Sequence, residues 1–224
     1  MKRIAALLLV IVLIITAAGC GRANGKEIPT PTPEPTATPA PTPTPGPHEP
    51  TVAFVIANQQ FNFKEYEMCR VLFTIDGYET LTAGRQIGTA VSMDGREATV
   101  DAVIGDLSAD ELDALIVIGG SGATVLYDDP ALRTLLQAVY AAGKPVGAIC
   151  LAPVTLANAG LLSGRDATVY PDESAVTALT QGGANYIEDS DVVTDGLIVT
   201  ANGPDAANGF AVAVQSLLGG DTMP

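Results

Sequence analysis

Histidine, cysteine and tryptophan are scarce in this sequence of 224 residues. It has one histidine, His48, three cysteines and no tryptophan. A folded region without histidine lacks the usual general base of nucleophilic enzymes. Two cysteines beyond Cys20 do not make a disulfide framework. These absences argue against a histidine-dependent peptidase and a disulfide-stapled domain, and we expect no metal and no cofactor.

Positive charge is the second shortage. The chain has 11 lysines and arginines against 25 aspartates and glutamates, which gives a formal net charge of −14. Nucleic-acid binding requires a cluster of basic side chains, and no such cluster is visible. We therefore expect no nucleic-acid partner and attribute the acidity to solubility.

The N-terminus has the pattern of an export signal. Lys2 and Arg3 precede an apolar run at the short end for a membrane-spanning helix. The run Thr16-Ala17-Ala18-Gly19-Cys20 resembles the bacterial lipobox, with alanine replacing the usual leucine at position 17. We predict a lipoprotein signal peptide over residues 1–20 and a lipid on Cys20 that anchors the chain to the bacterial cell membrane. An uncleaved anchor or a plain secretory signal is the alternative, and each places the domain outside the cytoplasm.

A proline-rich segment follows. Ten of the 16 prolines fall between Pro29 and Pro50, mostly alternating with threonine. Such a segment can neither form a strand ladder nor bury a core, so we predict an extended, disordered stalk over residues 21–50. A proline-rich recognition motif is the competing interpretation. One domain with a single core is then expected over residues 51–224.

Strand and helix patterns alternate through this domain. Apolar runs predict strands at 51–57, 79–83, 114–118, 145–149, 167–170 and 197–201. Helices are expected at 63–76, 130–142, 152–159, 172–181 and from about 204, with a hairpin signal at Asp94-Gly95. The alternation predicts an α/β three-layer sandwich whose mostly parallel central sheet is covered by helices on both faces. Its ligand site is expected beyond the C-terminal ends of the strands.

The strongest chemical signal is Ala148-Ile149-Cys150-Leu151-Ala152. A buried strand runs into the cysteine and a helix is expected directly after it. The small residues on both sides are what a tight nucleophile elbow requires. Cys150 would lie at a helix N-terminus, where N–H groups and the helix dipole favour a thiolate. A buried structural cysteine is the alternative interpretation.

Glu65 is the second candidate. On a helical projection it falls within the apolar arc, and a core-facing carboxylate is unfavourable unless it is protonated or paired. The arc comprises Tyr66, Met68, Cys69, Val71, Leu72, Phe73 and Ile75. A frayed helix with Glu65 as a first-turn cap is the alternative. We favour a site role because this position faces the same sheet edge as Cys150.

Gly119-Gly120 closes the strand expected at 114–118. Glycines at a strand end let backbone N–H groups approach a ligand. Together with the N–H of Leu151, they are candidate donors to an oxyanion. The cysteine, glutamate and glycine signals end three different strands and converge on one crevice.

At these positions the chain resembles the ThiJ/PfpI family, whose fold is flavodoxin-like. The resemblance is carried by Ala148-Ile149-Cys150-Leu151-Ala152-Pro153, Phe61-Asn62-Phe63-Lys64-Glu65-Tyr66, Ile118-Gly119-Gly120 and Thr200-Ala201-Asn202-Gly203-Pro204. It implies that Glu65 is protonated and hydrogen-bonds the sulfur of Cys150, which is readily oxidised to a sulfinate. It also places Tyr170 and Asn202 in the pocket and allows a homodimer.

The departures from the family pattern decide between functions. Peptidase-like members have a histidine where this chain has Leu151, and others supply one from the loop that contains Tyr170 here. Peptidase activity is therefore disfavoured. We predict glyoxalase- or deglycase-type chemistry on small reactive carbonyls, in which Cys150 adds to the carbonyl and Glu65 moves the proton. A redox-responsive or binding module acting on an oxidant is the alternative, with a Cys69–Cys150 disulfide as a minor variant, and an inactive scaffold is the third interpretation.

Overall fold

The structure is a computed structural model that describes residues 49–219. The predicted signal peptide, Cys20 and nearly all of the predicted stalk lie outside the described residues. Among the described residues, none of the helices is both long and apolar enough to span a membrane.

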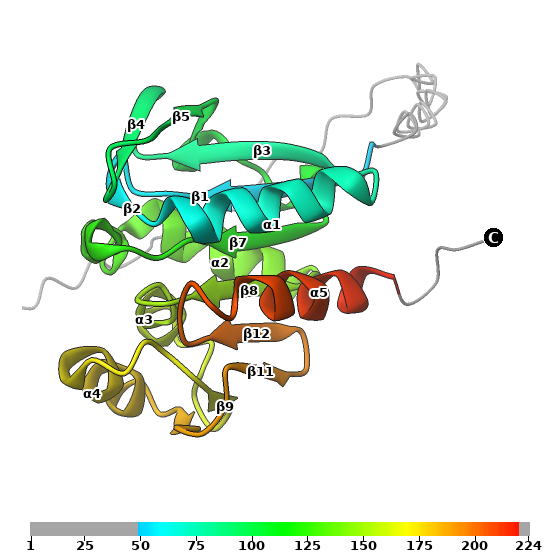
Figure 1. The fold of residues 1–224 in the computed structure, drawn as a ribbon. Helices are drawn as coiled ribbons and strands as arrows, with labels where there is room; N and C mark the ends of the chain where they lie inside the picture. The colour runs from blue at the N-terminus through cyan, green and yellow to red at the C-terminus, as the bar shows by residue number, and fades with distance from the viewer. Residues whose placement is uncertain (1–48, 220–224) are drawn as a thin grey trace, which may run out of the picture. The chain divides into compact units, whose positions relative to one another are not determined.

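Strands and helices alternate along the described chain (Figure 1). The helices are α1 Phe63–Ile75, α2 Pro130–Ala141, α3 Pro153–Asn158, α4 Glu173–Gln181 and α5 Ala207–Leu218, with short 3-10 turns η1 Ile104–Asp106, η2 Ala109–Glu111 and η3 Ser121–Leu126. The strands are β1 Thr51–Val55, β2 Gln59–Phe61, β3 Glu79–Gly84, β4 Gly88–Ser92, β5 Glu97–Val100, β6 Ala102–Val103, β7 Ala114–Val117, β8 Val146–Ile149, β9 Asp166–Ala167, β10 Asn185–Tyr186, β11 Val192–Asp195 and β12 Ile198–Ala201.

Seven strands form the central sheet in the order β11-β12-β8-β7-β1-β3-β6. All neighbouring pairs are parallel except β11 with β12, which closes one edge as an antiparallel hairpin. The chain moves from β1 to β3 on one side and later returns to β7 on the other. In open α/β sheets ligands bind at such a reversal of strand order, which here lies at the C-terminal ends of β1 and β7.

Helices cover both faces of this sheet, and the alternation of β1 shows how they do so. Val52 and Phe54 point into the core beneath α1 and α5, whereas Ala53 and Val55 point into the core beneath α2 and α3. Figure 1 shows α1 and α5 side by side on one face, with α2 and α3 on the other. Burying each large side chain contributes about 1.5–3 kcal/mol, and the predicted flavodoxin-like α/β sandwich is confirmed.

Local sequence signals set several helix starts. The side chain of Asn62 accepts a hydrogen bond from the backbone N–H of Glu65 at the start of α1. Asp129 and Asp172 do the same for α2 and α4. Caps of this kind satisfy orphan N–H groups and contribute about 1 kcal/mol each.

Several sequence predictions were wrong in detail. The strand expected at 167–170 is only β9, and it pairs with β10 outside the central sheet. The last helix begins at Ala207 rather than near Pro204. The hairpin signal at Asp94-Gly95 is confirmed as the turn between β4 and β5, which join β2 in a separate sheet. These short strands have few residues each, so apolar periodicity gives little signal for them.

The apolar arc predicted for α1 was too wide. Glu65, Tyr66, Cys69 and Phe73 are buried, but Ile75 is 73% exposed and Met68 and Val71 are also exposed. The helix presents a narrow stripe to the sheet, and side chains about 100° away from its centre reach solvent. The central part of the prediction, a core-facing glutamate, is confirmed.

Candidate active site

The candidate site lies at the C-terminal ends of three neighbouring strands of the central sheet. Glu65 lies on the helix that follows β1 and β2, Gly119 follows β7, and Cys150 follows β8. Since β1, β7 and β8 are adjacent and parallel, their C-terminal ends lie at one edge. The structure thus brings together the three sequence signals.

Cys150 has a backbone conformation that is unfavourable for a residue with a side chain. Its φ is 63°, in the left-handed region, where only Gln60 joins it among the described non-glycine residues. Such a conformation costs about 1–3 kcal/mol and is maintained by the surrounding structure. The N–H of Cys150 donates to Ala201 O at 2.8 Å, and its carbonyl accepts from the N–H of Tyr170 at 2.8 Å. These bonds fix the elbow on both sides.

The Glu65 carboxyl is fully buried, with no exposed surface. Its Oε2 accepts a hydrogen bond from the N–H of Gly119 at 3.0 Å. Its Oε1 is buried without a hydrogen-bond partner of ordinary geometry. Burial is the main cause that raises the pKa of Glu65 to about 7, while the Cys150 thiol and the Gly119 N–H act in the opposite direction. A substantial fraction of this carboxyl is therefore protonated near neutral pH.

Gly119 reveals how closely the cysteine and the glutamate approach each other. A Cβ placed on Gly119 would lie 2.5 Å from Cβ of Cys150 and 2.8 Å from Oε2 of Glu65. The two side chains therefore border the same small space, which only a glycine leaves free. Their interaction affects both pKa values, although no hydrogen bond of ordinary geometry joins them among the described residues.

The Cys150 thiol is not biased toward the thiolate, contrary to the sequence prediction. Burial is the first cause that raises the pKa of this thiol, and the Glu65 carboxylate is the second. Helix α3 begins only at Pro153 and has six residues, so its dipole gives little support. The backbone N–H groups of Gly120 and Leu151 lower the pKa but do not outweigh burial.

The same two N–H groups are the predicted oxyanion donors. Both act on the Cys150 sulfur, so they converge on the place where a carbonyl oxygen attached through that sulfur would lie. Gly120 has φ 106°, and a Cβ there would meet Gln60 O at 2.5 Å. The Asn62 N–H donates to Gly119 O at 3.0 Å, which ties this turn to the segment before α1.

Tyr170 and Asn202 have different hydrogen-bond partners. Tyr170 is 45% exposed, and its ring lies against Gly203. Its N–H bond to the Cys150 carbonyl places it at the elbow. Asn202 instead donates from Nδ2 to Asp191 Oδ1 at 2.9 Å. These hydrogen bonds join the turn after β12 to Asp191, the residue directly before β11.

Tyr127 was missed by the sequence analysis. It ends the turn η3, and its phenol is close enough to Cys150 and Asp172 for their charges to influence it. Burial, followed by those two charges, raises its pKa to about 12. Only the folding of η3 toward the elbow brings it there, so no sequence pattern marks it.

Cys69 and Cys150 are both free thiols. Cys69 is fully buried in α1, and its Sγ is 3.8 Å from Ala207 O. Burial raises its pKa strongly. It is a core residue, and the disulfide variant is not adopted in this structure.

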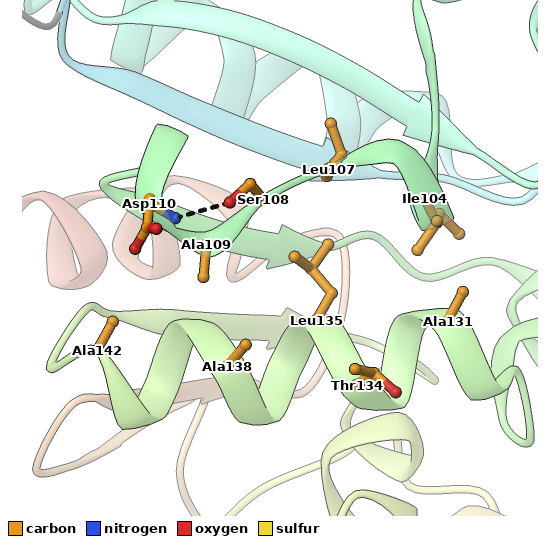
Figure 2. Close-up of a pocket in the computed structure, with 11 residues that line it drawn as sticks. Ile104, Leu107, Ser108, Ala109, Asp110, Ala131, Thr134, Leu135, Ala138 and Ala142 are labelled. Atoms are coloured by element: carbon orange, nitrogen blue, oxygen red, sulfur yellow. Dashed lines mark hydrogen bonds between the residues drawn. The ribbon is translucent and has the colours of Figure 1, made fainter. Parts of the chain in front are cut away.

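A separate hollow lies away from the elbow. It has a volume of about 590 Å³ and lies between α2 and residues 104–110 (Figure 2). Its lining is mostly apolar, with Leu135 and Ala138 facing Leu107 and Ala109. No residue of the cysteine site contributes to it. Residues 49–219 contain no cluster of three or more histidine, cysteine or acidic side chains that could hold a metal ion.

The arrangement supplies three chemical functions. Cys150 provides a nucleophilic sulfur, Glu65 provides a group that exchanges a proton near neutral pH, and the N–H groups of Gly120 and Leu151 can stabilise an oxyanion. Residues 49–219 contain no histidine, so none of the described residues supplies an imidazole.

Known proteins are similar to this chain in sequence and in fold. The family model described as DJ-1/PfpI family matches residues 50–217. An uncharacterised protein of Methanocaldococcus jannaschii is 38% identical over 164 residues, which cover 73% of this chain and 80% of that protein. A glutathione-independent glyoxalase of Caenorhabditis elegans is 28% identical over 144 residues, covering 64% of this chain and 75% of that protein.

A solved structure agrees with these matches. The crystal structure of a ThiJ/PfpI domain protein from Brachyspira murdochii has a TM-score of 0.73 and 31% sequence identity. The similarity covers 77% of this chain and 98% of that one. On this combined sequence and structural similarity, the chain belongs to the DJ-1/PfpI family.

Proposed function

We propose that this chain is a cysteine-dependent enzyme of glyoxalase or deglycase type that acts on small reactive carbonyls outside the cytoplasm. The observation that carries the proposal is the buried contact region of Glu65 and Cys150 around Gly119. A carboxyl group whose pKa is raised to about 7 can give or take a proton at neutral pH. The C. elegans relative, a glutathione-independent glyoxalase, supports this reaction class.

The proposed steps balance without a cofactor. For a 2-oxoaldehyde such as methylglyoxal, the Cys150 sulfur bonds to the aldehyde carbon and the thiol proton passes to the oxygen through Glu65. Glu65 then takes the proton from that carbon and returns it to the neighbouring carbon, while the hydroxyl proton of the adduct moves to the neighbouring oxygen, and a 2-hydroxy thioester results. Water breaks the C–S bond, so the net reaction adds one water to give a 2-hydroxy acid and the free thiol.

The N–H groups of Gly120 and Leu151 are proposed to hold the carbonyl oxygen as negative charge develops on it. One such donor contributes about 3–4 kcal/mol in acyl-transfer enzymes. Peptide hydrolysis fits less well, because the leaving amine needs a proton donor such as an imidazole, and none lies among residues 49–219.

A redox-responsive role without turnover is the second candidate. The unpartnered Oε1 of Glu65 favours it, since a protonated carboxyl at this position could donate to an oxygen of a Cys150 sulfinate. The raised pKa of the Cys150 thiol does not separate the two candidates, because the thiolate is the form that reacts with oxidants and with carbonyls alike.

Methylglyoxal turnover by the purified full-length chain separates the two candidates. We expect 2-hydroxy acid formation by the wild type and at least a 100-fold loss of kcat/KM in both Cys150→Ala and Glu65→Gln. The matched controls are Cys69→Ala, which removes the other thiol of the domain, and Glu67→Gln, an exposed glutamate on the same helix. A wild type without turnover would reject the enzymatic proposal, and Cys69→Ala losing as much activity as Cys150→Ala would reject the site.

A further inference from the structure

The Cys150 thiol lacks a cationic neighbour. Among residues 49–219, no lysine or arginine is among the groups that act on its pKa. The backbone N–H groups of Gly120 and Leu151 are the favourable partners of a negative charge there, and Glu65 is the unfavourable one. Among the described residues, negative charge on the sulfur is therefore stabilised by these peptide N–H groups.

All seven lysine and arginine side chains of the described residues are engaged elsewhere. Five form ion pairs, namely Lys64 with Asp205, Arg85 with Asp129, Arg96 with Asp94, Arg133 with Asp128, and Arg165 with Asp195. Arg70 lies over the ring of Tyr66, and Lys144 donates to the carbonyls of Ala109 and Asp110. Lys64 is the one cation that influences Glu65, and its charge is compensated by Asp205 at 2.6 Å.

Two further charged groups, Asp172 and Asp191, are acidic. Asp172 begins α4 two residues after Tyr170, and its charge acts on the same Tyr127 phenol as that of Cys150. Asp191 is held by the neutral amide of Asn202. Residues 49–219 contain 22 acids against the seven bases, so the wider field also repels anions.

The lack of a cation at the sulfur makes entry into the site less favourable for an anionic reactant than for a neutral one. Two like charges close together in a site that little water reaches repel each other strongly. A carboxylate entering beside Glu65 and the sulfur would lose water without gaining a counter-ion. A neutral carbonyl avoids this penalty, because charge develops on its oxygen only after the sulfur has added and the two N–H groups then accept it.

We propose that the Cys150 site selects uncharged electrophiles, so that its substrates are neutral aldehydes and dicarbonyls and compounds bearing a carboxylate or phosphate are rejected. That these compounds are substrates rests on the proposed function. The selection itself concerns access to the thiol and is measurable without turnover. By the same rule, the acid product of a glyoxalase-type reaction is repelled from the site.

A pair of alkylating reagents tests the selection. Iodoacetamide and iodoacetate both form a C–S bond with the thiolate and release iodide, but only iodoacetate is an anion. Because both need the same thiolate, the ratio of their rates is independent of the thiol pKa. On the full-length chain, mass spectrometry of the Cys150 peptide gives this ratio, which is compared with the ratio for 2-mercaptoethanol.

We expect the ratio of the iodoacetamide rate to the iodoacetate rate to be at least tenfold higher for Cys150 than for 2-mercaptoethanol. Salt at 1 M should reduce the preference, since it shortens the screening length to about 3 Å. A ratio equal to that of 2-mercaptoethanol would overturn the inference.

Variants at Tyr170 separate charge from shape. Tyr170→Lys places a cation beside the elbow at a position that is 45% exposed, and Tyr170→Gln is the neutral control. We expect at least a threefold smaller iodoacetamide preference in Tyr170→Lys than in Tyr170→Gln. Equal preferences in the two variants would show that charge is not the cause and would overturn the inference.

A separate measurement of methylglyoxal turnover distinguishes failure of this inference from failure of the proposed function. A chain with the alkylation preference but no turnover contradicts only the proposed function. A chain with turnover but no alkylation preference contradicts only the inference.

Discussion

At the scale of single residues, the Glu65 carboxyl and the Cys150 thiol occupy one buried space around Gly119. The Glu65 carboxylate raises the pKa of the Cys150 thiol, whereas the neutral thiol lowers the pKa of Glu65, and little water reaches either group. Removing one proton from the pair is therefore easier than removing two, and the pair titrates as a unit. One proton shared between them is the state in which sulfur can attack and the carboxyl can move the proton.

The pH dependence of stability should report this burial. The pKa of Glu65 is raised from 4.5 to about 7 in the folded state. Its contribution to stability is therefore fully present below pH 4.5 and is lost as the pH rises through about 7. Glu65→Gln stays neutral, so its unfolding free energy relative to the wild type should increase by about 2.5 kcal/mol between pH 5 and pH 8.

Urea unfolding of both proteins at several pH values measures this difference. Glu67→Gln is the control, and its difference from the wild type should remain nearly constant over the same range. A constant difference for Glu65→Gln would mean that the carboxyl is not buried.

At the scale of secondary-structure elements, the turn after β7 determines the shape of the site. Gly119 must leave room for Cys150 and Glu65, and Gly120 must leave room for the segment before α1. Helix α1 then directs Glu65 toward the cysteine rather than toward solvent. Strand ends, one glycine turn and one helix start therefore position the reactive groups, with little help from side-chain hydrogen bonds.

Gly119→Ala should damage both the site and the fold. Its Cβ would come within 3 Å of Cys150 Cβ, Ile149 O and Glu65 Oε2. Overpacking of this kind costs about 1–3 kcal/mol, so we expect a lower Tm and a large loss of turnover. Gly105→Ala is the control, since its Cβ would meet only Ala131 Cβ, at 3.7 Å. Wild-type Tm and activity in Gly119→Ala would refute this geometry.

At the scale of the whole molecule, the described domain is one part of the proposed organisation. Residues 1–20 are proposed to be a lipoprotein signal and residues 21–50 a stalk that holds the domain away from the membrane. An extended proline-rich segment spans about 3.1 Å per residue. A tethered enzyme of this kind would act on carbonyls at the cell surface rather than throughout the medium.

Cys20→Ala tests the tether. Expressed in a bacterium, the wild type should incorporate a labelled fatty acid and fractionate with membranes, and the variant should lose the label. Cys69→Ala should retain it. If Cys20→Ala loses the label but stays in the membrane fraction, residues 1–18 act as an uncleaved anchor. Absence of label in the wild type contradicts the lipoprotein proposal.

Much of the central fold followed from local patterns. Apolar runs at β1, β7 and β8 and the helices between them were predicted because buried parallel strands are nearly continuous in apolar residues. The strand at β9 was predicted too long, β10 was not predicted, and the width of the buried stripe on α1 was overestimated. Two-residue strands and stripe edges depend on which neighbours happen to pack there, and no local pattern encodes that.

By itself, the amino-acid sequence determined the α/β class, the glycine turn, the elbow around Cys150 and the core-facing position of Glu65, because these depend on residue size, apolar periodicity and chain order. Only the tertiary structure decided the protonation of the thiol, the approach of Tyr127, and the engagement of every described cation away from the sulfur. Those properties arise from burial and from distances between residues far apart in the chain, since electrostatic energies depend on both.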